Sequence, residues 1–331
     1  KMYTLSTDNL FGADMTDCIT ALEYEGGIIA IDSGQVRPQM AACYLLETDS
    51  AVAVIEVGNN DSADRIIKVL QSRGRDVSEV SHVIVTHVHL DHAGGAGKLM
   101  QELPNASFLV HPRGARHMID PSRLEASARA VYGDETFDEM HGTLISVPED
   151  RVVIVDEGDS TEVGKRRLEF IDTPGHARHH FCVWDEQTRG WFTGDTFGIS
   201  YRELDTAGGP FIFPTTTPIQ FDPPALKASI RRMMESKPEN MYLTHFGRVR
   251  DTERLSLDML SGVDYLAELG ERHDGDENRT SNIQSELMDW LMSRARAHGV
   301  SCSDDDLREI FAGDVMLNSQ GIEFWLDHGR D

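Results

Sequence analysis

Cysteine is scarce in this chain of 331 residues, and its four cysteines lie far apart in the sequence. None belongs to a C-x-x-C pair, which argues against a disulfide framework and against a cysteine-ligated zinc site. The four are Cys18, Cys43, Cys182 and Cys302. No stretch approaches the roughly 20 consecutive apolar residues that a membrane span requires, and residues 1–15 lack the apolar core of a secretory signal. We therefore expect a cytoplasmic protein without a membrane partner.

Basic residues are also few, because 31 lysines and arginines stand against 56 acidic residues and leave a formal net charge of −25. A field of this sign repels phosphate backbones and anionic lipid surfaces. The densest basic runs are 165–167 and the pair Arg248 and Arg250, which are short enough to be solvated surface. We therefore expect no nucleic acid as partner, and the sequence leaves a homodimer open.

Short apolar runs dominate the first 250 residues and predict β-strands between turns rich in Gly, Asp and Ser. A helical period over Ser62–Arg73, with Ser62 as the cap and Gly74 after the end, predicts a helix among these strands. Because strands outnumber helices and are interrupted by them, we expect a layered α/β fold. The predicted strands are 27–31, 42–46, 52–55, 83–85, 108–110, 152–155, 168–171 and 191–192.

Beyond Arg250 the apolar residues recur at helical spacing instead. The polar stretch Glu271–Asn282 predicts a loop between two such helices, and Ser303 followed by three aspartates predicts the start of a third. We interpret residues 251–331 as a helical appendage to a main domain over residues 1–250, with its apolar stripes serving packing.

Four metal-ligand side chains follow the predicted strand 83–85 within the segment THVHLDH, residues 86–92. In an extended chain, residues at positions i, i+2 and i+4 point to the same side, so His87, His89 and Asp91 converge. His92 points elsewhere and can reach a second ion together with Asp91. Imidazole and carboxylate are ligands that Zn²⁺, Mn²⁺ and Fe²⁺ accept, and the segment therefore predicts a metal site.

Three further candidate ligands follow other apolar runs. The Pro-Gly turn in DTPGH presents His176, the Gly-Asp turn in FTGD presents Asp195, and the run YLTHFG presents His245. One ion takes about four ligands, so these residues supply what the first segment lacks. The sequence predicts one site assembled from the ends of several strands.

Together these motifs resemble those of the metallo-β-lactamase superfamily, in the same order along residues 25–250. The resemblance implies a four-layer αβ/βα sandwich, with a C-terminal helical appendage in this chain, and a pair of metal ions at one edge. It implies a first site of His87, His89 and His176, a second site of Asp91, His92 and His245, and a bridging Asp195 with a shared hydroxide opposite.

Departures from known relatives narrow the branch. True β-lactamases lack an aspartate at the position of Asp195, and flavodiiron proteins carry glutamate where His89 stands. Residues 196–199, TFGI, do not match the arginine- and cysteine-rich segment of persulfide dioxygenases. RNase Z shares the core, but the charge of −25 disfavours tRNA. The chain is similar to the glyoxalase II and acyl-homoserine-lactone lactonase branch, whose members hydrolyse thioesters, lactones and related esters.

The function that we expect is a dinuclear metal-dependent hydrolase of a small-molecule ester, lactone or thioester, acting through a metal-bridging hydroxide. A bound metal lowers the pKa of water from 15.7 to roughly 7, and a second ion polarises the carbonyl and receives the oxyanion. Zn²⁺ is the preferred assignment, with Fe²⁺ and Mn²⁺ as alternatives. Two other classes stay open, namely an iron-dependent oxidoreductase of the persulfide dioxygenase type and a metal-bearing sensor or scaffold with little turnover.

Supporting residues lie near the predicted ligands in the sequence. Asp91 is expected to help place the hydroxide, and Tyr201, six residues after Asp195, to donate a hydrogen bond to the oxyanion. His180, four residues after His176, is expected to contact the ligands from outside the coordination sphere.

The irregular segment 205–224 is the remaining candidate. We interpret it as a loop that faces the acyl substrate, with Phe211 and Phe213 as contacts, or as a simple wrapping of the core.

Overall fold

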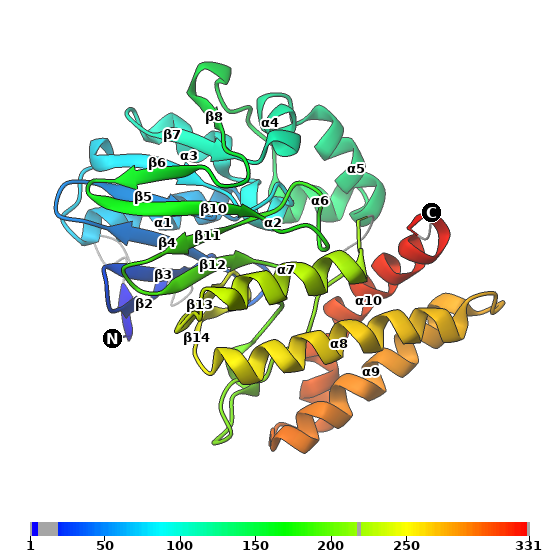
Figure 1. Ribbon diagram of the computed structural model, residues 1–331. Helices are drawn as coiled ribbons and strands as arrows, with labels where there is room; N and C mark the ends of the chain where they lie inside the picture. The colour runs from blue at the N-terminus through cyan, green and yellow to red at the C-terminus, as the bar shows by residue number, and fades with distance from the viewer. Residues whose placement is uncertain (1, 6–18, 217–219, 330–331) are drawn as a thin grey trace, which may run out of the picture.

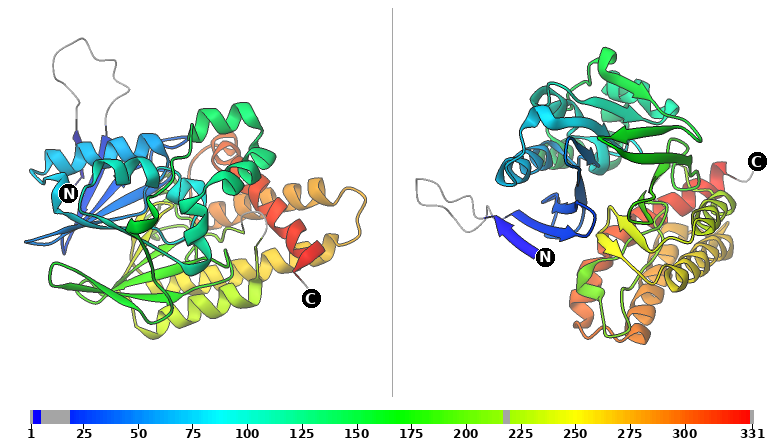
Figure 2. Two further views of the ribbon diagram at one scale, coloured as in Figure 1. Left: turned by 90° about the horizontal axis from the view of Figure 1, so that it is seen from above. Right: turned by 60° about the vertical axis from the view of Figure 1, so that its left-hand side comes forward.

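The protein is described by a computed structural model over residues 2–5, 19–216 and 220–329. Two β-sheets face each other and helices cover the outer side of each, so the layers follow the order α, β, β, α (Figure 1). Figure 2 shows the same stack from two other directions, with the last three helices beside the second sheet. The predicted αβ/βα sandwich with C-terminal helices is confirmed.

The first sheet has eight strands in the order of the sequence. Strands β1 to β5 are antiparallel to their neighbours, whereas β5, β6, β7 and β8 run parallel, so their carboxyl ends meet at one edge. The strands are β1 (Met2–Leu5), β2 (Ile19–Tyr24), β3 (Ile28–Asp32), β4 (Ala42–Glu47), β5 (Val52–Ile55), β6 (Val80–Ile84), β7 (Ser107–Val110) and β8 (Val152–Ile154).

The second sheet has six strands in the order β14-β13-β12-β11-β10-β9. Its pairs are antiparallel except for β12 with β13, which run parallel and therefore end at the same edge. The strands are β9 (Ser160–Val163), β10 (Arg166–Asp172), β11 (Phe181–Asp185), β12 (Gly190–Gly194), β13 (Asn240–Leu243) and β14 (Gly247–Val249).

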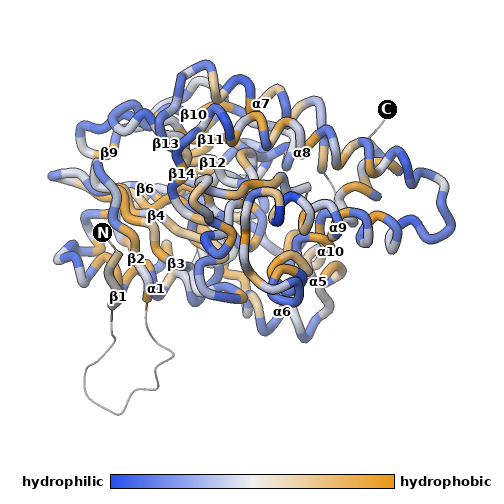
Figure 3. The backbone as a smooth tube through the Cα atoms, turned by 90° about the horizontal axis from the view of Figure 1, so that it is seen from below, coloured by the Kyte–Doolittle hydropathy of each residue, from blue (hydrophilic) through white to orange (hydrophobic). Residues whose placement is uncertain are grey.

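Hydrophobic side chains fill three spaces between the layers. The space between the sheets contains alternate residues of both, such as Tyr44 of β4 and Phe192 of β12, whose rings meet edge to face at 5.3 Å. Every residue of β3, β5 and β12 is buried, which explains why β5 is a continuous apolar run and why the apolar residues of β3 and β12 are consecutive rather than alternating. Figure 3 shows the hydrophobic strands inside and hydrophilic segments around them.

The helices fall into two sets. The first set accompanies the first sheet, and the second set, from α7 onward, accompanies the second. They are α1 (Asn60–Ser72), α2 (Leu90–Ala93), α3 (Ala96–Glu102), α4 (Pro112–Ile119), α5 (Ser122–Tyr132), α6 (Asp134–His141), α7 (Pro223–Glu235), α8 (Thr252–His273), α9 (Arg279–His298) and α10 (Asp304–His328).

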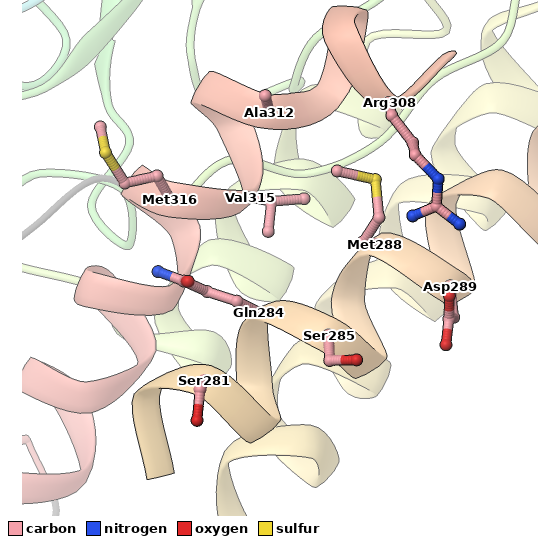
Figure 4. Close-up of a pocket in the computed structure, with 9 residues that line it drawn as sticks. All are labelled: Ser281, Gln284, Ser285, Met288, Asp289, Arg308, Ala312, Val315 and Met316. Atoms are coloured by element: carbon pink, nitrogen blue, oxygen red, sulfur yellow. The ribbon is translucent and has the colours of Figure 1, made fainter. Parts of the chain in front are cut away.

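The C-terminal helices share one hydrophobic cluster with the second sheet. Met241 and Leu243 of β13, Met259 and Val263 of α8 and Phe311 of α10 all belong to it. None of the helices in the described ranges has the length and hydrophobicity that crossing a membrane requires. Between α9 and α10 lies a surface pocket of about 440 Å³, lined by Met288, Val315 and Arg308 among others (Figure 4).

Two predicted boundaries are wrong. Helix α1 begins at Asn60 because Asn59, rather than Ser62, is its N-cap. The Asn59 side chain accepts from the Ser62 backbone N–H, and the Ser62 hydroxyl oxygen accepts from the Asn59 backbone N–H. The predicted loop Glu271–Asn282 is shorter, since α8 continues to His273 and α9 begins at Arg279. His273 is fixed there between Asp276 and Glu286, each 2.8 Å away, which extends the helix over the polar residues.

The cysteines of the described ranges are free, as their spacing predicts. Cys43 and Cys182 are buried and Cys302 is partly exposed, with no disulfide among them. Cys18 lies outside the described residues.

Candidate metal centre

The seven predicted ligands lie in the segments that follow four strands at one edge of the sandwich. The segment THVHLDH leaves β6 after Ile84 and enters the short helix α2. His176 follows β10, Asp195 directly follows β12, and His245 comes two residues after β13. Because β12 and β13 are parallel, their carboxyl ends place Asp195 and His245 side by side.

His87, His89 and His176 form the first group of converging ligands. Nδ1 of His89 lies 2.8 Å from Nε2 of His87 and 3.1 Å from Nε2 of His176. Burial lowers the pKa of all three imidazoles, and neighbouring histidines lower those of His87 and His89 further. The rings are therefore neutral near pH 7, which is the form that binds a metal.

Asp91, His92 and His245 form the second group. Oδ2 of Asp91 lies 3.3 Å from Nε2 of His245 and 3.5 Å from Nε2 of His92. Burial disfavours the protonated form of both histidines, but Asp195 and Asp91 outweigh it and raise the pKa of each. This group thus holds excess negative charge, which protons take up in the absence of a metal.

Asp195 joins the two groups through its two carboxylate oxygens. Oδ1 lies 3.2 Å from Nε2 of His92 and 3.5 Å from Nε2 of His245, whereas Oδ2 lies 3.4 Å from Nε2 of His176. The residue is 4 % exposed, and burial opposes its ionisation, but the charge of His92 and its neighbours lowers the pKa well below the usual range. An ionised carboxylate therefore faces both groups.

The donor set fits divalent ions. Oδ1 of Asp195 and Nε2 of His92 are buried and make no hydrogen bond, although they lie 3.2 Å apart. Buried polar atoms without hydrogen bonds are rare and call for an ion or another partner. Imidazole nitrogens and carboxylate oxygens that converge from several sides are the ligands of Zn²⁺, Fe²⁺ and Mn²⁺.

The ring nitrogens that face away from the centre contact acceptors in the surrounding structure. His245 Nδ1 lies 3.0 Å from the carbonyl of Met40, and His176 Nδ1 lies 3.5 Å from the carbonyl of Thr215. A carbonyl accepts only from a protonated nitrogen, so these contacts leave the Nε2 lone pair directed at the metal site.

Glu56 is a supporting residue that the sequence analysis missed. It follows β5, is 1 % exposed, and has a left-handed backbone with φ of 63°. Its Oε1 accepts from the Thr86 backbone N–H at 3.2 Å, and its Oε2 lies 3.3 Å from Nδ1 of His92. An acidic residue directly after the apolar run 52–55 is a signal that could have identified it.

His180 lies where the sequence predicts a supporting role. Its Nε2 accepts from the Asp195 backbone N–H at 3.2 Å, and its Nδ1 lies 2.8 Å from the hydroxyl of Thr173. Gly194 makes this approach feasible, because a Cβ there would lie 2.3 Å from Oγ1 of Thr86 and 2.4 Å from Nε2 of His180. Gly194 also has φ of 47°, a conformation that glycine adopts at little cost.

The backbone of Tyr201 lies close to the metal centre, but its hydroxyl faces a carboxyl group of α10. Ser200 pairs with the backbone of His245 and Phe246, which places Tyr201 beside the second group. Its hydroxyl donates to Oδ1 of Asp314 of α10 at 3.2 Å. The oxyanion role of Tyr201 therefore stays a prediction, and no sequence signal marks Asp314.

Phe211 and Phe213 lie in the cluster shared with the C-terminal helices. They are 3 % and 1 % exposed, and both rings contact the ring of Phe311 of α10. Substrate contact by these rings stays a prediction. Within the predicted loop 205–224, residues 217–219 lie outside the described residues.

A family model described as the metallo-beta-lactamase superfamily matches residues 36–245. A metallo-beta-lactamase fold-containing protein of Sulfurisphaera tokodaii is 28 % identical over 229 residues, which cover 67 % of this chain and 79 % of that protein. An N-acyl homoserine lactonase of Bacillus thuringiensis is 24 % identical over 68 % of this chain and 87 % of its own length. A thioesterase of Emericella nidulans is 28 % identical over 50 % of this chain, but over only 38 % of its own length.

Solved structures support the fold. A crystal structure of an archaeal superfamily protein from Sulfolobus tokodaii superimposes with a TM-score of 0.63 at 23 % identity, over 90 % of this chain and 98 % of that one. A metallo-beta-lactamase family protein from Thermus thermophilus gives the same TM-score at 18 % identity, over 92 % and 94 % of the two chains.

Proposed function

Because this chain belongs to the metallo-beta-lactamase superfamily, we propose that it is a dinuclear metal-dependent hydrolase of a small-molecule ester, lactone or thioester. The observation that carries the proposal is the carboxylate of Asp195, whose two oxygens face two separate groups of ligands. A single ion does not require seven ligand residues, since four satisfy it.

The first ion would be held by His87, His89 and His176, the second by Asp91, His92 and His245, with Asp195 shared. Ions bound there would lower the pKa of water toward 7 and polarise a carbonyl group. The neutral imidazoles of the first group keep their lone pairs directed inward, and the ionised Asp91 and Asp195 balance the added charge.

The substrate class comes from relatives and from charge. A homoserine lactonase and a thioesterase are among the similar proteins, and both kinds of substrate present a carbonyl with an oxygen or sulfur leaving group. Two dications with two carboxylates and one hydroxide leave a single positive charge, which suits a neutral or monoanionic acyl compound. The protein as a whole carries −25, so we propose no nucleic acid as partner.

The test is hydrolysis of a panel of lactones, thioesters and aryl esters by metal-free protein reconstituted with Zn²⁺, Mn²⁺ or Fe²⁺. We expect turnover that requires close to two ions per chain, measured by elemental analysis. Asp195→Asn should lower kcat/KM by more than about 100-fold, the upper end for residues that merely support ligands. Asp134→Asn, whose side chain is 84 % exposed, is the matched control and should leave activity unchanged.

Two outcomes would contradict the proposal. One tightly held iron per chain, with oxygen consumption and no hydrolysis, would favour an oxidoreductase. Full activity after exhaustive chelation, or a trapped acyl-enzyme, would point to a serine or cysteine nucleophile instead.

A further inference from the structure

A carboxyl group of the C-terminal helix α10 reaches the hydroxyl of Tyr201. Asp314 is 9 % exposed and Tyr201 is 1 % exposed, and their oxygens Oδ1 and Oη lie 3.2 Å apart. The two residues are 113 positions apart in the sequence. Asp314 lies on a helix whose remaining buried side chains are largely apolar, so a buried carboxyl there is costly unless it has a function or a strong partner.

An arginine covers the other side of the pair. The guanidinium carbon of Arg37, from the loop between β3 and β4, lies 4.2 Å from the centroid of the Tyr201 ring. Arg37 also forms an ion pair with Glu203, in the short helical turn Arg202–Leu204. Tyr201 is thus fixed between three segments of the chain, and its ring has little freedom to rotate away from Asp314.

This pair lies beside the metal centre. The backbone N–H of Ser200 donates to the carbonyl of His245, and the carbonyl of Ser200 accepts from the N–H of Phe246. Tyr201, the next residue in the sequence, therefore lies close to the predicted ligand His245. The loop that carries Arg37 also reaches the centre, because the carbonyl of Met40 contacts Nδ1 of His245.

The charges that face Asp314 come from each of these segments. They are Arg37 from the β3–β4 loop, His245 from the loop after β13 and Asp195 from the loop after β12. Glu203 faces Arg37 and offsets part of its charge. Burial raises the pKa of Asp314 to about 7, although His245, Tyr201 and Arg37 oppose the rise. Both protonation states of this carboxyl are therefore accessible near neutral pH.

A phenol has one hydrogen to donate, and this decides what each state allows. When Asp314 is ionised, it can only accept, so the Tyr201 hydrogen is held by α10. When Asp314 is protonated, its O–H can donate to the phenolic oxygen, and the phenolic hydrogen is released for another acceptor. The two states differ by one proton, which Asp314 exchanges with solvent, and the phenolic hydrogen stays bound to the Tyr201 oxygen in both.

On the basis of the hydrolase function proposed above, we propose that Asp314 is a positioning residue for Tyr201, whose protonated carboxyl frees the phenolic hydrogen to bond an oxygen of the substrate at the metal centre. The C-terminal helices would then contribute to substrate binding as well as to packing.

The experiment compares kcat/KM across pH 5 to 9 for wild type, Asp314→Asn, Tyr201→Phe and the double variant, each with its metal content measured. The amide of Asp314→Asn can donate to the phenolic oxygen at every pH and so mimics the protonated carboxyl. We expect the ratio of Asp314→Asn to wild type to rise with pH, reaching about 100-fold, the low end for one oxyanion donor. In the Tyr201→Phe background the ratio should be independent of pH.

Asp305→Asn is the matched control, because Asp305 is exposed on the first turn of the same helix. It should show the wild-type pH profile. The inference would be overturned if the ratio of Asp314→Asn to wild type, with Tyr201 present, did not change with pH. It would also be overturned if the ratio rose in the same way in the Tyr201→Phe background. Either result would leave the hydrolase function intact.

A second readout does not depend on turnover. In metal-free protein, a carboxyl whose folded pKa is raised stabilises the fold fully below its unfolded pKa near 3.8, and this stabilisation is lost as the pH rises through about 7. The unfolding midpoint of wild type should therefore fall relative to Asp314→Asn between pH 4 and 7. Absence of hydrolysis would refute the proposed function, whereas absence of this shift would refute the titration of Asp314.

Discussion

Replacement of Glu56 by glutamine should weaken one of the two groups of ligands and leave the other intact. Glu56 touches the centre through His92, whose Nδ1 lies 3.3 Å from Oε2, and it contacts no residue of the first group by its side chain in the described structure. If His92 binds a metal through Nε2, its Nδ1 carries the hydrogen and faces an acceptor. In the variant an amide N–H₂ would face that hydrogen, or the amide would turn and lose its bond with Thr86.

The magnitude follows from what the substitution preserves. The amide oxygen can still accept from the Thr86 N–H, so the loss is confined to the charged contact with His92. Residues that orient a metal-bound histidine contribute about 10- to 100-fold to metal affinity, which is about 1.4 to 2.7 kcal/mol. The 3.3 Å separation is long for a charged hydrogen bond, so we expect the lower half of this range.

The assay is titration of metal-free protein with Zn²⁺ against a chelating dye that resolves two affinities. Glu56→Gln should weaken one of the two affinities by about 10-fold and leave the other within error. Glu169→Gln, whose side chain is 48 % exposed on β10, should shift neither. An equal loss at both sites would mean that Glu56 maintains the fold of the segment rather than orienting His92, and no loss would remove it from the metal centre.

Three further outcomes follow from the structure. Gly194→Ala should lower the unfolding midpoint and the metal content, because the added Cβ would overlap the side chains of Thr86 and His180 at a residue with positive φ. As a control, Gly313→Ala in α10, where an added Cβ meets no other atom, should stabilise the protein by about 0.5–1 kcal/mol in thermal unfolding. Asp185→Ala should cost about 3–5 kcal/mol in denaturant unfolding, since it leaves Arg166, whose side chain is 3 % exposed, as a buried unpaired charge. Metal-free Asp314→Asn protein, in which the opposite pH dependence of the Asp314 carboxyl is removed, should lose stability as the pH falls below about 6.5, because the folded pKa values of the first group of histidines lie below their unfolded values. A pH-independent unfolding midpoint of this variant from pH 7 to 5 would contradict the neutral state of these histidines.

The candidate ligands could be predicted because their signal is local. His87 and His89 follow an apolar run directly, and the alternation of an extended chain is enough to bring them to one side. The predicted convergence of Asp91 with them is wrong, because the chain turns into helix α2 at Leu90 and Asp91 joins the second group with His92. The predicted turns also place His176 and Asp195 after strands, where the structure has them. In each case the chain within about six residues contains the information, and the two sheets only bring the ends together.

The supporting residues could not be predicted in the same way, because their roles arise from contacts between distant segments. Asp314 meets Tyr201 across 113 residues, and its own neighbours in sequence predict only a packed helix. The observed start of α1 differs from the predicted one for a related reason. Both Asn59 and Ser62 can cap a helix. Which of them becomes the N-cap depends on the reciprocal hydrogen bonds between them and on the Ser62 hydroxyl, which donates to the carbonyl of the distant Ser33.

The position of α10 also bears on the conformation of the segment 205–224 where it is described. Asn318 of α10 accepts from the Thr216 N–H at 2.6 Å, and the Thr216 hydroxyl donates to the carbonyl of Asn318 at 2.9 Å. The neighbouring carbonyl of Thr215 faces Nδ1 of the predicted ligand His176. The same helix therefore contacts the surroundings of both groups of ligands, through Thr216 on one side and Tyr201 on the other. Motion of α10 would alter both contacts together, so the C-terminal helices are coupled to the metal centre by bonds that the apolar packing alone would not provide.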